Sequence, residues 1–133
     1  MNAEIKTVIT ILIATIWIGL SEFIRNQLIL KSAWENHFNN LGLVFPSKPI
    51  NGFIWMLWSL VFALIIFYIS KEVSFKKSII FSWLYGFVLM WLVLGNLLVL
   101  PINILFLAIP LSMFEVFVAN LIIYKMQGKK IKL

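Results

Sequence analysis

Four long apolar segments constrain this chain more than any other feature of its sequence. They cover residues 5–30, 52–70, 78–100 and 103–124. The first segment could also end earlier, at Phe23, because a polar stretch follows that residue. Each segment can cross about 30 Å of hydrocarbon as a helix that rises about 1.5 Å per residue. The sequence therefore predicts an all-α membrane protein, a bundle of four antiparallel transmembrane helices with a partly helical external loop between the first two.

The composition agrees with a bilayer as the solvent. Hydrophobic residues make up 62% of the chain and charged residues 12%, whereas a soluble domain of this size carries about 25% charged residues. A chain of 133 residues is long enough for one domain. We therefore expect residues 1–133 to form a single transmembrane domain, and we expect its first span to be retained because no clear cleavage site follows it.

Several kinds of chemistry are excluded by residues that the chain lacks. It has no cysteine and no aspartate, and its one histidine is His37. Disulfides, thiolate ligands and cysteine nucleophiles are therefore impossible, and we expect no metal site and no cofactor. Nucleic-acid binding is not expected either, because the basic residues flank the apolar segments and do not form a patch on a soluble face. The five carboxylates are Glu4, Glu22, Glu35, Glu72 and Glu115.

The distribution of basic residues predicts the orientation in the membrane. Eight lysines lie on the side of the two termini and of the loop between the second and third spans: Lys6, Lys71, Lys76, Lys77, Lys125, Lys129, Lys130 and Lys132. Three basic residues lie on the other side: Arg25, Lys31 and Lys48. Cytoplasmic loops are enriched in lysine and arginine. We therefore predict a multi-pass protein of the cell (inner) membrane with both termini in the cytoplasm.

The segment from residue 26 to 51 is the only sizeable loop that we predict. Apolar residues share one helical face in its first part: Leu30, Ala33, Trp34, Phe38 and Leu41. This pattern predicts either a continuation of the first helix or a separate helix on the outer leaflet. The tripeptide Pro-Ile-Asn precedes both the second and the fourth spans, and it predicts Asn51 and Asn103 as their N-caps.

Glu115 is the most unusual residue because it lies near the middle of the fourth span. An ionisable group at that depth costs about 2.5–3.5 kcal/mol on insertion scales. It shares a helical face with small residues, Ala108, Ser112 and Ala119, which is typical of close helix approach. We therefore expect Glu115 to be protonated or hydrogen-bonded. Two roles stay open: a proton relay or anchor for a polar ligand, and a neutral hydrogen bond that fastens two helices.

Glu22 and Arg25 form a second candidate, since residues three apart meet on one helix face. They lie inside the bundle if the first span reaches Leu30, and they reach the headgroups if it ends at Phe23. A polar pocket that opens outward, with Glu115 as its floor, would make these groups one ligand or proton site. The alternative is that they pair in separate helix interfaces. The residues of this candidate site are Glu115, Glu22, Arg25, Asn96, Asn26 and Ser112.

The order of these features resembles that of small four-span bacterial membrane proteins of uncharacterised function. The resemblance rests on the stretch Gly19-Leu20-Ser21-Glu22 through Lys31-Ser32-Ala33-Trp34 to Leu41-Gly42-Leu43, and on Met90-Trp91-Leu92 and Gly95-Asn96 in the third span. It implies no activity. Small multidrug-resistance transporters also carry a glutamate in their first span, but theirs lies mid-span, whereas Glu22 is near one end. The trimeric membrane enzymes of glutathione and eicosanoid metabolism are of comparable size, but their motif is not matched by Glu35-Asn36-His37.

Three classes of function are compatible with these residues. The first is a small transporter, channel or lipophilic-ligand-binding protein that uses the intramembrane carboxylate. The second is a non-catalytic accessory or assembly subunit whose polar groups fasten helices. The third, a membrane-embedded enzyme, is the least favoured, because only Glu115 and the Glu22–Arg25 pair offer reactive groups. The expected partners are membrane lipids and either further copies of the chain or another membrane protein, since four spans enclose a polar pathway only with difficulty.

Overall fold

The computed structural model describes residues 2–131 and is all-helical. Met1, Lys132 and Leu133 lie outside the described residues, and with them one of the lysines used to predict the orientation. Four helices are long and apolar enough to cross a membrane: Ala3–Ile29, Pro49–Glu72, Phe75–Asn96 and Ile102–Met126. The predicted fold class, a four-helix membrane bundle, is confirmed.

Three of the four spans contain a π-helical segment or a 3-10 turn in addition to regular α-helix. The first joins α1 (Ala3–Phe23) to the π-helical segment η1 (Ile24–Ile29), and the second is α3 (Pro49–Glu72) alone. The third consists of α4 (Phe75–Trp83), the π-helical η2 (Leu84–Val88) and α5 (Leu89–Asn96). The fourth begins with one 3-10 turn, η3 (Ile102–Ile104), and continues as α6 (Leu105–Met126). A short helix, α2 (Lys31–Asn40), follows the first span.

The start of α3 differs from the prediction in its capping. Pro49 is the first residue of the helix, where proline fits well because it lacks an N–H that would have no partner there. Asn51 is two residues further on, inside the first turn, and its Oδ1 accepts a hydrogen bond from the Lys48 N–H at 3.0 Å. The predicted N-cap at Asn51 was therefore wrong, because the proline already begins the helix.

The start of the fourth span differs in the same way. Asn103 lies inside the turn η3, and its side chain caps neither this turn nor α6. Pro101 precedes the turn in an extended conformation. The predicted N-cap at Asn103 was therefore wrong as well.

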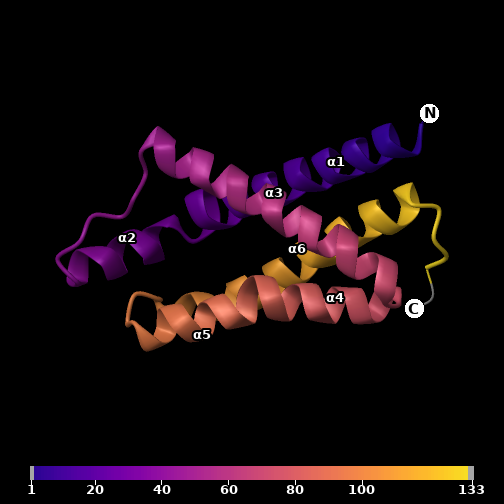
Figure 1. Cartoon of the computed structure of the whole chain (residues 1–133). Coiled ribbons are helices and arrows are strands. Elements are labelled where there is room, and N and C mark those ends of the chain that lie inside the picture. Colours follow the sequence, from indigo (N-terminus) through magenta and orange to yellow (C-terminus); the bar gives the residue numbers. More distant parts are fainter. Residues whose placement is uncertain (1, 132–133) are drawn as a thin grey trace.

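The first helix does not stop at Phe23 but runs on to Ile29, where Leu30 breaks it before α2. Figure 1 shows α2 at the end of the bundle that lies away from both termini. We call this end, with α2 and the turn at residues 97–101, the loop end. We call the opposite end, with both termini and the turn between α3 and α4, the terminal end.

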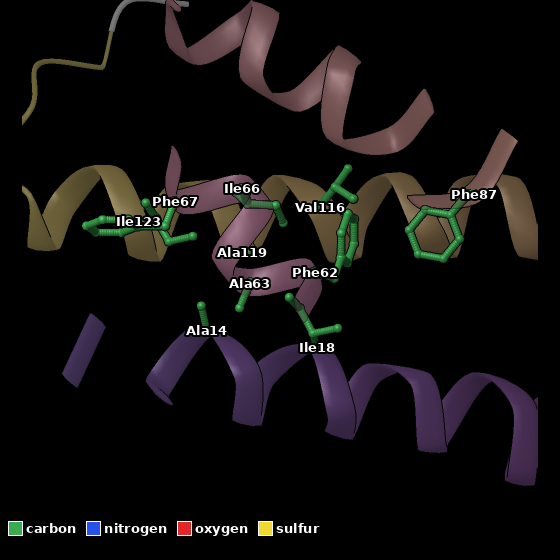
Figure 2. Packing of buried hydrophobic residues seen from close by; sticks show 10 residues of the cluster. All are labelled: Ala14, Ile18, Phe62, Ala63, Ile66, Phe67, Phe87, Val116, Ala119 and Ile123. Carbon is green, nitrogen blue, oxygen red and sulfur yellow. The ribbon is translucent and has the colours of Figure 1, made fainter. Parts of the chain in front are cut away.

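Helices α3 and α6 form the centre of the bundle. The helix α1 packs against both of them, and so does α4. Ten buried apolar residues of α1, α3, η2 and α6 meet in the core: Ala14, Ile18, Phe62, Ala63, Ile66, Phe67, Phe87, Val116, Ala119 and Ile123. In Figure 2 the side chains of Ala14 and Ile18 point up from α1 toward α3, and the α6 ribbon runs behind α3. The Phe62 ring lies directly against the backbone at Gly86, where a β-carbon would collide with it.

The outward surface of the bundle carries many large apolar side chains. Large hydrophobic side chains on every span are exposed, among them Ile16, Leu28 and Phe106, which is 87% exposed. Such a surface is incompatible with water over so large an area and is the expected surface of a protein that faces lipid. The chain is therefore a multi-pass integral membrane protein.

Candidate functional site

Glu22, Arg25 and Glu115 meet in the loop-end half of the bundle, and we call them the charged cluster. Arg25 Nη1 lies 2.8 Å from Glu115 Oε2, and Arg25 Nη2 forms an ion pair with Glu22 Oε1. All three residues are buried, with exposed fractions of 3%, 4% and 0% in sequence order. The Arg25 guanidinium therefore pairs with a carboxylate of its own span, Glu22, and joins the first span to the fourth through Glu115.

The local helix geometry brings Asn26 to the same place. Glu22 and Arg25 are three residues apart, at the point where α1 widens into η1. Asn26 Nδ2 donates to Glu22 Oε2 at 2.9 Å and approaches the Glu22 carbonyl at 3.2 Å. Single π-helical turns inside α-helices occur frequently at functional sites. At this one, the side chains of Glu22, Arg25 and Asn26 are joined by hydrogen bonds.

Three further residues hold the cluster in place, and the sequence reasoning missed them. Ser21 Oγ donates to Glu115 Oε2 at 2.8 Å, and Trp17 Nε1 donates to the Glu115 carbonyl at 3.0 Å. Trp34 Nε1, on α2, donates to Asn26 Oδ1 at 3.1 Å. Trp17, Ser21 and Arg25 are spaced four apart, so the stripe that faces Glu115 was visible in the helical periodicity.

The cluster has more negative than positive charge. Two carboxylates face one guanidinium, which leaves a formal charge of −1 when both are ionised. Glu115 Oε1 is buried without a hydrogen-bond partner among the described residues. The guanidinium also lies 4.8 Å from the centre of the Phe87 ring, which covers one of its faces. With both carboxylates ionised, the cluster is therefore one positive charge, or one proton, short of neutrality.

A cavity of about 190 Å³ opens beside the cluster, between the first span, α2, α5 and the start of the fourth span. Its polar wall consists of Glu22, Arg25, Asn26 and Gln27. The other walls are apolar and largely aromatic: Trp34, Phe38, Phe45, Pro46, Trp55, Met90, Trp91, Leu94, Val99, Ile104 and Ala108. Few polar groups in an apolar concavity are the usual features of a small-molecule site.

A larger groove of about 480 Å³ lies between the first span, the loop that follows α2 and the start of α3. It shares Glu22, Asn26, Gln27, Pro46 and Trp55 with the cavity. The two spaces therefore meet at the wall that carries Glu22 and Asn26.

The six residues predicted as one site do not all lie together. Glu22, Arg25, Asn26 and Glu115 belong to one hydrogen-bonded network. Glu22 lines both spaces, whereas Glu115 lies behind Arg25 and is not among the described residues that line them. Ser112 is buried on the side of α4, where its hydroxyl accepts a hydrogen bond from Trp83 Nε1 at 2.9 Å. Asn96 is exposed at the end of α5 and lies outside the network.

A second polar group, which we call the neutral cluster, lies in the terminal-end half and consists of Ser78, Ser82 and Asn120. Ser78 Oγ donates to Asn120 Oδ1 at 2.5 Å, and Asn120 Nδ2 donates to the Val116 carbonyl at 2.8 Å and approaches Ser82 Oγ at 3.5 Å. All three residues are 0% exposed. The sequence reasoning missed Asn120, although it lies five residues after Glu115 in an apolar span.

Comparisons of the chain with protein-family models, with curated proteins and with solved structures found no match. Within residues 2–131, no group of three metal-ligating side chains lies close enough together to hold a metal ion. A proposal for the function therefore rests on the arrangement of the charged cluster and the cavity beside it.

Proposed function

We propose that the chain is a lipophilic-ligand-binding protein of the membrane, with its binding site in the cavity beside the charged cluster. The observation that carries the proposal is the composition of that cavity, in which the side chains of Glu22, Arg25 and Asn26 converge on a space whose other walls are apolar. The ligand is a small amphipathic molecule. Its polar part lies against Glu22 and Asn26, and its apolar part lies among the aromatic side chains of α2 and α5.

The contrast with the neutral cluster supports a ligand site over a purely structural role. Asn120 and the two serines fasten α4 to α6 without any formal charge. Helix fastening in this bundle therefore does not require ionised groups, and each buried charge is expensive in lipid. A buried ion pair is also weak evidence of added stability. Charges that lie beside a cavity are better explained by what occupies the cavity.

We also propose that both termini lie in the cytoplasm, on the inner membrane, so that the loop end faces outward. The excess of lysine at the terminal end supports this orientation. The groove between the first span and α3 then gives the ligand access from the outer leaflet. Because the chain has no cysteine, single cysteines introduced at exposed Asn40 and at Gln127 would test the orientation with an impermeant thiol reagent, and only the Asn40 variant should react in intact cells.

The test of the binding function is native mass spectrometry of the gently solubilised protein, with identification of the small molecules that co-purify. We expect a defined amphipathic molecule on the wild-type protein, a strong loss of it in Glu22→Gln, and retention in the control Glu72→Gln, which makes the same change at the exposed terminal end. A bare chain, or a stable complex with another membrane protein and no small molecule, would favour the assembly-subunit function instead. The same spectra report whether the chain forms a homo-oligomer, which we expect because four spans alone enclose a polar pathway only with difficulty.

A further inference from the structure

We propose that the ligand is a lipophilic cation, an amine or quaternary ammonium group on an apolar body, and that it binds beside Glu22 in exchange for one proton. This inference rests on the proposed binding function and names its ligand class.

An anionic ligand is disfavoured because the one cation of the cluster is already engaged. Arg25 Nη1 is bonded to Glu115 and Nη2 to Glu22. One face of the guanidinium is covered by the Phe87 ring at 4.8 Å. An anion in the cavity would have to displace a buried carboxylate from Arg25, and that carboxylate would then be left without a positively charged partner, which is costly in a low-dielectric interior.

The charge balance of the cluster favours a cation. Two buried carboxylates share one guanidinium, and Glu115 Oε1 has no hydrogen-bond partner among the described residues. Without ligand, a proton on one of the two carboxyl groups makes the cluster neutral. When a cation binds beside Glu22, Arg25 neutralises Glu115 and the cation neutralises Glu22. The proton then leaves to the aqueous phase, so that charge is conserved within the site.

The walls of the cavity fit the same ligand. Trp34, Trp55 and Trp91 line it together with Phe38 and Phe45. The faces of such rings attract ammonium groups, tryptophan most strongly. The apolar body of the ligand would be buried by the same side chains.

The other charged groups near the cavity are few and peripheral. Lys48 is exposed where it lines the larger groove. On α2, Lys31 and Glu35 form an ion pair of 3.6 Å whose side chains are about half exposed, and His37 bonds the Leu98 carbonyl at 2.9 Å. The residues of α3, α5 and α6 that line the two spaces carry no charge. The pH dependence of binding therefore comes from the charged cluster.

Three small molecules of nearly the same shape separate the possibilities. Benzyltrimethylammonium is a permanent cation, neopentylbenzene is its neutral isostere, and benzylsulfonate carries a negative head of similar geometry. Binding to the full chain in detergent micelles is followed by the fluorescence of the cavity tryptophans and by calorimetry, with protein-free micelles as the blank. Because the ammonium compound does not titrate, any pH dependence belongs to the protein.

We expect saturable binding of the ammonium compound only, with a Kd that falls about tenfold for each unit rise in pH over the range in which the site holds a proton. A pH indicator in weakly buffered solution should detect one proton released for each cation bound. In Glu22→Gln the Kd should rise at least about tenfold and lose its pH dependence, whereas Glu72→Gln should match the wild type.

Equal binding of the neutral isostere, preferential binding of the sulfonate, or a Kd for the ammonium compound that does not change with pH would overturn the inference. Failure of all three compounds would overturn it as well. Native mass spectrometry then distinguishes the two failures. A co-purifying molecule of another class would contradict only the proposed cationic ligand and leave the binding function standing. A chain without any bound molecule would contradict both proposals.

Discussion

The two polar clusters of this bundle solve the same packing problem in different ways. The neutral cluster joins α4 to α6 through Ser78, Ser82 and Asn120, and none of these residues lines a described cavity. The charged cluster joins the first span to α6 through Arg25, and a cavity and a groove lie beside it. Hydrogen bonds between neutral groups are thus sufficient where two helices need only to be held together. Charges occur where the bundle leaves space.

The largest expected effect is that of removing the cation from the charged cluster. Arg25→Met leaves two buried carboxylates without a positively charged partner, and we expect the free energy of unfolding to fall by about 3–5 kcal/mol. Reversible unfolding in mixed micelles would measure it. The control Lys31→Met removes a half-exposed ion-pair partner and should change stability by at most about 1 kcal/mol. A similar small effect of both substitutions would contradict the description of Arg25 as the centre of the cluster.

A smaller effect is expected at the neutral cluster. Asn120→Ala removes the interhelical hydrogen bond from the Ser78 hydroxyl, and such bonds in membranes contribute about 0.6–1.7 kcal/mol. It also removes the bond from Asn120 to the Val116 carbonyl within α6. The same unfolding measurement should therefore show a loss of about 1–2 kcal/mol. Binding of the ammonium compound should not change. Loss of binding in this variant would mean that the two clusters do not act separately.

Glu115→Gln should alter the stability less still, by less than about 1 kcal/mol, because the amide oxygen can still accept from Arg25 and from Ser21. The cluster then holds one carboxylate and one guanidinium, and it is neutral without a bound proton. We expect an intact fold, weaker binding of the ammonium compound, and no proton release on binding. Persistent proton release would show that the exchanged proton comes from another group.

A comparably small effect on stability is expected at the contact between α2 and the charged cluster. Trp34→Phe keeps an aromatic wall but removes the hydrogen bond to Asn26 Oδ1, which should lower the free energy of unfolding by about 0.5–1.5 kcal/mol. Calorimetry should show binding of the ammonium compound weakened by less than about tenfold. A complete loss of binding would mean that Trp34 positions Asn26 and does more than cover the cavity.

The fold was predictable because its signals are local. Apolar runs set the four spans, and the spacing of Glu22 and Arg25 indicated that the two side chains can meet on one helix face, as they do. The bond from Arg25 to Glu115 joins residues 90 positions apart, and no local pattern specifies which helix faces which. The stripe of Trp17, Ser21 and Arg25 only shows which side of the first helix is polar.

Two other features depended on competition between local preferences. Asn51 and Asn103 are good capping residues, but the proline two positions before each one had already set where the chain turns into helix. Asn96 belongs to the same span as the buried residues of η2. It nevertheless lies exposed at the end of α5, where the neighbouring helices no longer cover it. Whether Asn96 is buried depends on how far the neighbouring helices extend, and the helical periodicity of its own span does not show this.

The two partners of Arg25 are synthesised at very different times. Glu22 precedes it by three residues, so that the first span can enter the membrane as a neutral pair, whereas Glu115 is made 90 residues after Arg25. The last span therefore arrives with a lone carboxyl group until it reaches Ser21 and Arg25. Docking of the last helix on the first is then the event that completes biogenesis, and a chain truncated before the fourth span would present an unfinished polar face to the proteases that survey the bilayer.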